Sequence, residues 1–194
     1  MSAQILLFDR VEFLTVKIEA NKGEFPLDSS FPQLEIDTEK FELLTRSDLV
    51  YPDDQANDPR LFMLTYGLKI SKGEIGDQRR VPYDIEIEAT GYFRYIGGEE
   101  FKEERRFRAV RFSGYQILYG AIREMVSNVT ARSRHGLWHL PARTFNAIAE
   151  ARAIEDETER KKIVAEAIDD LAKNAAAAQK KKKPQRRTAT KSKD

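Results

Sequence analysis

Cysteine is absent from the 194-residue sequence, and histidine occurs only twice. Without cysteine the chain forms no disulfide framework, no thiolate zinc site and no cysteine nucleophile, and we expect a cytoplasmic location. The two histidines, His135 and His139, are close in sequence, but Gly136 lies between them and no third ligand is near. We therefore predict ordinary loop histidines and no metal site.

Nucleotide-binding and acid–base motifs are also missing. The pair Gly97-Gly98 and the stretch from Gly73 to Gly76 lack both the P-loop lysine pattern and the order of a dinucleotide site, which is strand, glycine loop and helix. The adjacent carboxylates of Asp169 and Asp170 point apart on a helix and so form no catalytic pair. The sequence predicts a protein without cofactor or catalytic residues, which is not an enzyme.

Long hydrophobic runs are absent as well, since no apolar segment approaches the roughly 20 residues that span a bilayer. The first nine residues hold one short apolar run with no basic residue before it, which is not the layout of a signal peptide. Because 41% of the residues are apolar, the chain can still bury a core. We expect one domain of ordinary size without a membrane span.

Charge is distributed unevenly along the chain, although 33 Lys and Arg nearly balance 32 Asp and Glu. Residues 180–194 carry eight basic residues and one acidic residue, which leaves 25 basic and 31 acidic residues for positions 1–179. The chain is therefore an acidic body of net charge −6 with a basic tail of +7. Because the tail has no interleaved aromatic residues for base stacking, we favour a disordered extension over a nucleic-acid-binding segment.

Apolar residues alternate along four segments of the first half, which is the period of half-buried strands. The segments are Leu14–Ile18, Leu34–Ile36, Phe62–Ile70 and Tyr83–Phe93. A long connection separates the first two, and linkers rich in Pro, Asp, Asn and Gly separate the others. We predict a meander of four antiparallel strands with one apolar face and one acidic face.

In the second half the apolar period changes to that of a helix. Ser113 and Gln116 fit a capping box at the start of a first helix, Gly136 fits its end, and Pro141 fits the first turn of a second helix. The apolar face of the first helix consists of Leu118, Ile122, Met125, Val126 and Val129. The stretch from Ala151 to Ala178 is rich in helix formers but poor in large apolar residues, which predicts a protruding helix.

Strands followed by helices predict an α+β fold in which two helices cover one face of a four-stranded antiparallel sheet. We divide the chain into a domain over residues 1–150, a helical extension over residues 151–179 and a disordered basic tail over residues 180–194. Free strand edges and the helix layer favour association between copies. The residues expected in the oligomer interface are Leu118, Ile122, Met125 and Val129.

Large apolar residues gather in two predicted loops. The first group is Phe25, Pro26 and Phe31, and the second is Leu137, Trp138 and Leu140. Such residues usually fold down onto a core, and this is the default interpretation. Left exposed, they would line an apolar groove for another polypeptide.

Several motifs lie between Gly91 and Asn146. Residues 117–127 read Ile-Leu-Tyr-Gly-Ala-Ile-Arg-Glu-Met-Val-Ser, residues 133–136 read Ser-Arg-His-Gly, and residues 140–145 read Leu-Pro-Ala-Arg-Thr-Phe. They resemble, in this order, the first long helix, the Ser-Arg-Gly turn and the Leu-x-Pro-x-x-Phe entry to the last helix of the SecB export-chaperone family. Residues 91–97 are similar to the end of its fourth strand.

The resemblance implies an ATP-independent holdase that assembles as a homotetramer, a dimer of dimers, and binds unfolded polypeptides or preproteins. Family members pass such clients to the motor SecA and need no catalytic residue. The resemblance makes both groups of loop residues, Phe25, Pro26, Phe31, Leu137, Trp138 and Leu140, candidates for client contact. The basic tail departs from the acidic tail of export-type members, which keeps open two alternatives: a SecB-like chaperone that protects an antitoxin, and a nucleic-acid-binding protein.

Overall fold

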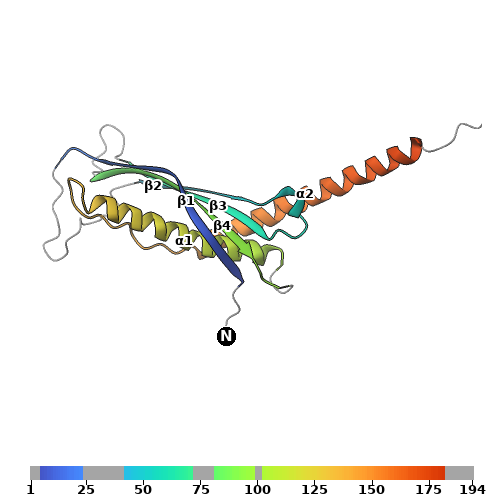
Figure 1. Cartoon of the computed structure of the whole chain (residues 1–194), viewed down its shortest axis with the longest axis horizontal. Helices are drawn as coiled ribbons and strands as arrows, with labels where there is room; N and C mark the ends of the chain where they lie inside the picture. The colour runs from blue at the N-terminus through green and yellow to red at the C-terminus, as the bar shows by residue number, and fades with distance from the viewer. Residues whose placement is uncertain (1–4, 24–41, 72–80, 99–101, 182–194) are drawn as a thin grey trace, which may run out of the picture.

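One antiparallel sheet and two long helices make up the described part of the chain in the computed structural model (Figure 1). The structure describes residues 5–23, 42–71, 81–98 and 102–181. Its elements are β1 (Leu6–Ala20), β2 (Glu42–Val50), the 3₁₀ turn η1 (Asp53–Gln55), β3 (Leu61–Ser71), β4 (Tyr83–Tyr95), α1 (Glu104–Thr130) and α2 (Asn146–Lys181). Within these ranges, neither helix combines the length and hydrophobicity that crossing a bilayer requires.

The strands lie in the order β1-β4-β3-β2, and all neighbours are antiparallel. This confirms the predicted α+β class with a four-stranded antiparallel sheet. Strands β2, β3 and β4 follow one another as in a meander, whereas β1 pairs with β4. The complete order is therefore that of a Greek key, in which β1 and β2 occupy opposite edges of the sheet.

One face of the sheet packs against α1 and holds the core (Figure 1). The largest fully buried residues of this core include Leu64, Leu68, Ile70, Ile85, Ile87, Phe93, Phe107 and Leu118. The helix approaches the sheet closely at Gly114, where an added Cβ atom would collide with Cδ2 of Leu64. The missing side chain of Gly114 therefore lets α1 lie directly on β3.

The second strand of the sheet was not predicted from the sequence. The predicted strand Leu34–Ile36 falls outside the described residues, and the observed β2 follows it in the chain. Thr45 and Ser47 interrupt the apolar alternation of β2, although they pair with core residues of β3. Ser47 is accommodated because its hydroxyl lies 2.8 Å from the hydroxyl of Tyr115. Polar inner positions of this kind hide an edge strand from a search for alternation.

The first helix begins before the predicted capping box. α1 starts at Glu104, so Ser113 and Gln116 lie inside it and the capping-box prediction is wrong. The early turns were missed because they contain Arg106 and Arg111, which are charged but buried. An apolar face that includes two arginines is not visible in the sequence pattern.

The second helix begins at Asn146, after the predicted start at Pro141. The preceding segment is bound to α1 instead. The hydroxyl of Tyr119 donates a hydrogen bond of 2.5 Å to the carbonyl of Pro141, and Nε of Arg123 donates one of 3.0 Å to the carbonyl of Leu140. Because these carbonyls accept hydrogen bonds from side chains of α1, they do not begin a helix of their own.

α2 continues without a break to Lys181, so the predicted domain boundary at residue 150 lies inside this helix. Its first turns pack beside α1, where Ala149 and Ala153 are fully buried. The remaining turns project away from the sheet, as Figure 1 shows. The predicted protruding helix is thus present, but it is one element with the second helix of the body.

Candidate functional site

The sheet face opposite α1 divides into a charged half and an apolar half. The charged half carries Lys17, Arg46, Lys69, Glu86 and Glu88, of which Arg46 and Glu88 form an ion pair of 2.9 Å. In the apolar half, Val50 pairs with Met63, and Met63 pairs with Tyr92. These three side chains therefore form one row across β2, β3 and β4.

This row borders an open groove of about 410 Å³ on the surface. The groove is lined by Asp9, Val50, Tyr51, Pro52, Leu61, Phe62, Met63, Tyr92 and Phe93. Val50, Leu61 and Met63 are 44%, 43% and 36% exposed. Apolar residues exposed one at a time are ordinary on a protein surface, whereas a contiguous apolar patch is typical of a binding surface. We call this feature the outer-face groove.

Charged residues beside the outer-face groove are paired with one another. Nη2 of Arg94 lies 2.7 Å from the carboxylate of Asp9, and Nε of Arg10 lies 2.7 Å from that of Glu12. Glu12 also accepts a hydrogen bond of 2.9 Å from the hydroxyl of Tyr92. The hydrogen bonds from Arg10 and then Tyr92 lower the pKa of Glu12 below its usual value. The groove thus has an apolar centre and a polar rim.

β1 is a long strand at one edge of the sheet. Among the described residues this strand pairs only with β4, and its register shifts at Asp9 and again at Leu14. Phe8, Leu14 and Val16 are all more than 40% exposed. A long edge strand with apolar side chains pairs readily with a further strand. The edge of β1 is therefore a second candidate contact surface.

Two of the six residues predicted to contact a client, Trp138 and Leu140, lie away from the surface. Trp138 and Leu140 are each 1% exposed and belong to the core, as the default interpretation of the loop residues expects. Leu137 is partly buried. The remaining candidates, Phe25, Pro26 and Phe31, fall outside the described residues. The outer-face groove was missed because its members come from four different strands and are adjacent only through strand pairing.

The predicted interface residues on α1 do not form one surface. Leu118 and Ile122 are completely buried between α1 and the sheet, so they are core residues of a single chain and this part of the interface prediction requires correction. Met125 is partly buried against the same core, and Val129 is 37% exposed. The helical period identified the apolar face correctly, but the sheet of the same chain covers it.

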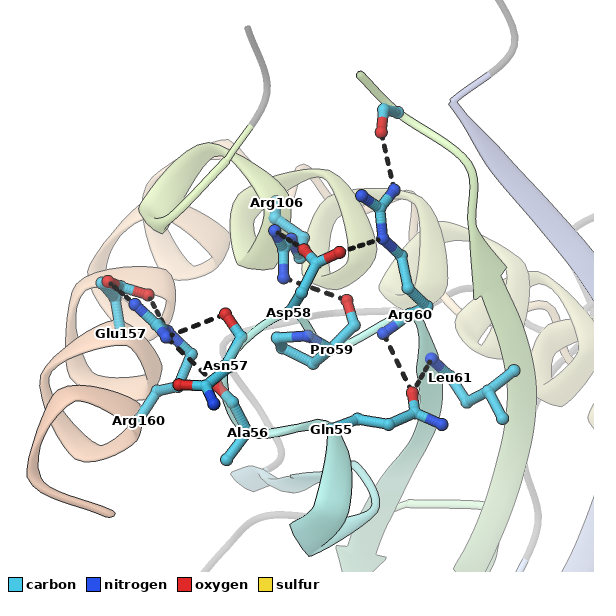
Figure 2. A network of polar contacts seen from close by, with 11 residues as sticks. Gln55, Ala56, Asn57, Asp58, Pro59, Arg60, Leu61, Arg106, Glu157 and Arg160 are labelled. Atoms are coloured by element: carbon cyan, nitrogen blue, oxygen red, sulfur yellow. Dashed lines mark hydrogen bonds and ion pairs between the residues drawn. The ribbon is translucent and has the colours of Figure 1, made fainter. Parts of the chain in front are cut away.

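A network of polar contacts holds the loop after β2 between the two helices (Figure 2). Arg106 of α1 forms an ion pair of 2.5 Å with Asp58 and donates a hydrogen bond of 3.1 Å to the carbonyl of Pro59. Arg160 of α2 pairs with Glu157 at 2.8 Å and donates hydrogen bonds to the backbone carbonyls of residues 56 and 57. These contacts fix the direction in which α2 leaves the body.

The two carboxylates of this network remain acidic groups. Burial raises the pKa of Asp58, but its hydrogen bond to Arg60 and the charge of Arg106 outweigh burial, and the pKa is lowered. Burial likewise raises the pKa of Glu157, and its hydrogen bond and ion pair with Arg160 lower it further than burial raises it. Both groups therefore stay ionised at neutral pH, as structural ion pairs require.

The histidines have structural contacts. Nε2 of His135 lies 2.7 Å from the carbonyl of Asn21, and Nδ1 of His139 lies 2.7 Å from the hydroxyl of Ser127. The Ser127 hydroxyl itself donates to the carbonyl of Arg123 at 2.9 Å, so it belongs to the helix backbone network. Within the described ranges, no group of three His, Asp or Glu side chains is arranged to hold a metal ion.

Comparisons with known proteins give likenesses of structure only. No protein-family model matches the chain, and no curated protein is detectably similar to it. Among solved structures, it is similar to the Mycobacterium tuberculosis Rv1957 SecB-like chaperone in complex with a ChAD peptide from the Rv1956 HigA1 antitoxin, with a TM-score of 0.48 and 14% identity over 72% of this chain and 91% of that chain. It is also similar to a protein of unknown function from Streptococcus agalactiae, with a TM-score of 0.38 and 12% identity over 73% of this chain and 100% of that chain. At these TM-scores neither likeness decides the function, which has to be argued from the residues of this chain.

Proposed function

We propose that the protein is an ATP-independent holdase, which binds unfolded polypeptides and keeps them from aggregating. The observation that carries the proposal is the outer-face groove, an open apolar groove of about 410 Å³ beside β1, a strand that pairs only with β4 among the described residues. The motifs between Gly91 and Asn146 that resemble the SecB family support the same function. A holdase needs apolar surface and reversible binding, and no catalytic group.

The groove fits an apolar side chain of an extended client. Val50, Leu61 and Met63 offer an apolar floor, and flexible side chains such as methionine adapt to different partners. The ion pairs of Asp9 with Arg94 and of Arg10 with Glu12 keep the rim solvated, which limits how far apolar contacts extend. The net charge of −6 over residues 1–179 also attracts clients that are locally basic.

We further propose that copies associate through the edge of β1, in a homotetramer built as a dimer of dimers. An edge strand of 15 residues provides backbone hydrogen-bonding groups along its length, and Phe8, Leu14 and Val16 provide apolar contacts beside them. This division of labour leaves the outer-face groove to the client. It also explains why Leu118 and Ile122, which lie in the core, are not needed in the interface.

Two classes of client fit this surface. One is a preprotein that is handed to SecA for export, and the other is an antitoxin that aggregates when it is unbound. A pull-down that compares SecA with the products of the neighbouring genes separates them. Binding to nucleic acid through residues 180–194 is the second alternative, and it predicts an affinity that falls steeply with salt and vanishes when these residues are removed.

Holdase activity is expected without nucleotide. The purified full chain should suppress the aggregation of a reduced, unfolded test protein at a stoichiometric ratio, and ATP should not change the effect, because apolar contact and charge attraction need no nucleotide. Light scattering measures the aggregation. An inert globular protein of similar size at the same concentration is the control. Undiminished aggregation at stoichiometric amounts of the chain would contradict the proposal.

Met63→Glu tests the location of the client site. Because Met63 lines the outer-face groove between Val50 and Tyr92, a carboxylate there should weaken the binding of a fluorescently labelled unfolded client by about tenfold, which corresponds to about 1.4 kcal/mol. The matched control is Leu44→Glu, which changes another exposed apolar residue of the same sheet face outside the groove. Equal client affinities for the two variants would place the client site elsewhere.

A further inference from the structure

Both ends of the loop after β2, residues 51–60, border the outer-face groove. Tyr51 and Pro52 at the start of the loop line the groove, and so does Leu61, the residue that follows the loop at the start of β3. The loop therefore forms one wall of the groove. Its conformation decides how Tyr51 and Pro52 lie against Leu61.

The side chain of Gln55 connects the middle of this loop to the groove. Gln55 ends the turn η1, and its Oε1 atom accepts hydrogen bonds of 3.2 Å and 3.3 Å from the backbone N–H groups of Arg60 and Leu61. Because η1 has only three residues, its position depends on contacts with the rest of the chain. Whatever holds the middle of the loop therefore also positions the backbone of Leu61.

Arg160 of α2 holds the middle of the loop, as Figure 2 shows. Its Nη1 atom donates hydrogen bonds of 3.1 Å and 3.3 Å to the carbonyls of Ala56 and Asn57, the two residues that follow Gln55. Its Nε and Nη2 atoms donate to the two carboxylate oxygens of Glu157, each at 2.8 Å. The side chains of Arg160 and Glu157 are only 13% and 7% exposed. A guanidinium that is buried and paired in this way has little freedom to turn, so the two loop carbonyls are held in place.

Tyr51 provides a second contact between the groove and the helices. Its ring centroid lies 6.0 Å from that of Phe62, which also lines the groove, and 5.9 Å from that of Phe107 in α1. Burial raises the pKa of the Tyr51 hydroxyl, and the positive charge of Arg160 opposes this rise. The charge of α2 is therefore close enough to act on the wall of the groove.

We propose that α2 positions the outer-face groove, with Arg160 as the positioning residue that acts through the loop after β2. The proposal rests on the function proposed for the groove. Because Arg160 binds the carbonyls next to Gln55, and Gln55 binds the amide of Leu61, a displacement of α2 changes the wall that a client contacts. Client binding and the packing of α2 on the loop are then coupled, and by linkage each favours the other to the same extent.

Removing both charges of the pair between Glu157 and Arg160 tests the coupling. The Arg160 double variant, Glu157→Gln with Arg160→Gln in the full-length chain, leaves neither partner of this buried pair as an uncompensated charge, but it loses the guanidinium that holds the loop. The matched control is the Arg152 double variant, Arg152→Gln with Glu155→Gln, which removes an exposed ion pair of 2.6 Å with the same i,i+3 spacing from the same helix. We expect the affinity for fluorescently labelled, reduced and carboxymethylated α-lactalbumin to fall about fivefold in the Arg160 double variant and to stay unchanged in the control.

A spectroscopic measurement on the chain without client separates positioning of the groove from a general loosening of the fold. Met63 lines the groove, whereas Met125 on α1 packs against the core. The methyl groups of both are isotope-labelled for NMR, and their signals are assigned with Met63→Leu and Met125→Leu. Because the chemical shift of a methyl group depends on the aromatic rings beside it, we expect the Met63 signal to shift in the Arg160 double variant while the Met125 signal stays in place. Neither signal should shift in the Arg152 double variant.

The possible outcomes separate this inference from the function on which it rests. If the unsubstituted chain binds no unfolded client, or if Met63→Glu binds it as well as Leu44→Glu does, the proposed function fails, and the methionine signals still decide whether α2 positions the groove. If Met63→Glu weakens client binding but the Arg160 double variant binds as tightly as the Arg152 double variant, the inference alone fails. Signals of Met63 and Met125 that shift together, or a Met63 signal that does not shift, would also overturn it.

Discussion

Replacing Trp138 by alanine is expected to lower the free energy of unfolding by about 3–5 kcal/mol. The indole is 1% exposed, and its ring centroid lies 6.1 Å from that of Tyr83. The backbone N–H of Trp138 donates a hydrogen bond of 2.9 Å to the hydroxyl of Thr130, so the residue is fixed against the end of α1. Its removal leaves a large cavity between the loop and the sheet. Chemical denaturation followed by circular dichroism measures the change.

Leu137→Ala is the matched control for this experiment. Leu137 precedes Trp138 in the same segment but is only partly buried, so Leu137→Ala should lower the free energy of unfolding by clearly less than Trp138→Ala. A loss of client affinity for Trp138→Ala, with the unfolding midpoint unchanged, would instead assign the indole to the client site. The comparison therefore separates the two roles that an apolar loop residue can have.

Asp156→Ala is expected to destabilise the chain by about 3–5 kcal/mol, because it leaves a buried guanidinium without its counter-charge. The side chain of Arg111 is 5% exposed, and its Nη2 and Nε lie 2.7 Å and 2.8 Å from the two carboxylate oxygens of Asp156. The hydroxyl oxygens of Ser47 and Tyr115 also accept hydrogen bonds from Nη1 of Arg111, but neither supplies a negative charge. Thermal and denaturant unfolding give the size of the loss.

Two further variants identify the cause. Asp170→Ala removes an exposed carboxylate of the same helix, whose only described ion pair is with Lys173 at 3.4 Å, and should change stability by less than about 0.5 kcal/mol. The double variant Arg111→Met with Asp156→Met removes both charges and should recover most of the stability that Asp156→Ala loses. If Asp156→Ala were as mild as Asp170→Ala, α2 beyond residue 150 would be an independent extension. A loss of stability of the expected size would show that α2 beyond residue 150 is part of the body.

The candidate site shows where sequence patterns stop being informative. The groove residues Val50, Leu61, Met63 and Tyr92 each belong to a strand, and three of the four strands were recognised from their alternation. Alternation, however, assigns the apolar residues of each strand to the core and predicts that the residues between them face the solvent. Only the pairing registers of the strands show that the solvent-facing residues of different strands are neighbours. A surface patch assembled from different strands therefore has no signature in any one segment.

Local sequence determined the kinds of element in this protein. Period-two alternation marked β3 and β4, period 3.6 marked the central turns of α1, and the run of helix formers after Ala151 marked the projecting part of α2, because backbone geometry fixes these periods within each segment. Composition likewise determined the absence of thiolate chemistry and the separation of an acidic body from a basic tail.

Tertiary structure alone decided which of these surfaces are covered. Arg106 and Arg111 could enter an apolar face of α1 only because Asp58 and Asp156, distant in sequence, neutralise them there. The position of β1 beside β4 placed β1 at the edge of the sheet in the described part of the chain, and the sheet covered the apolar face of α1 that the sequence had offered as an interface. The physical reason is that burial and ion pairing depend on contacts between distant segments, which no local period records.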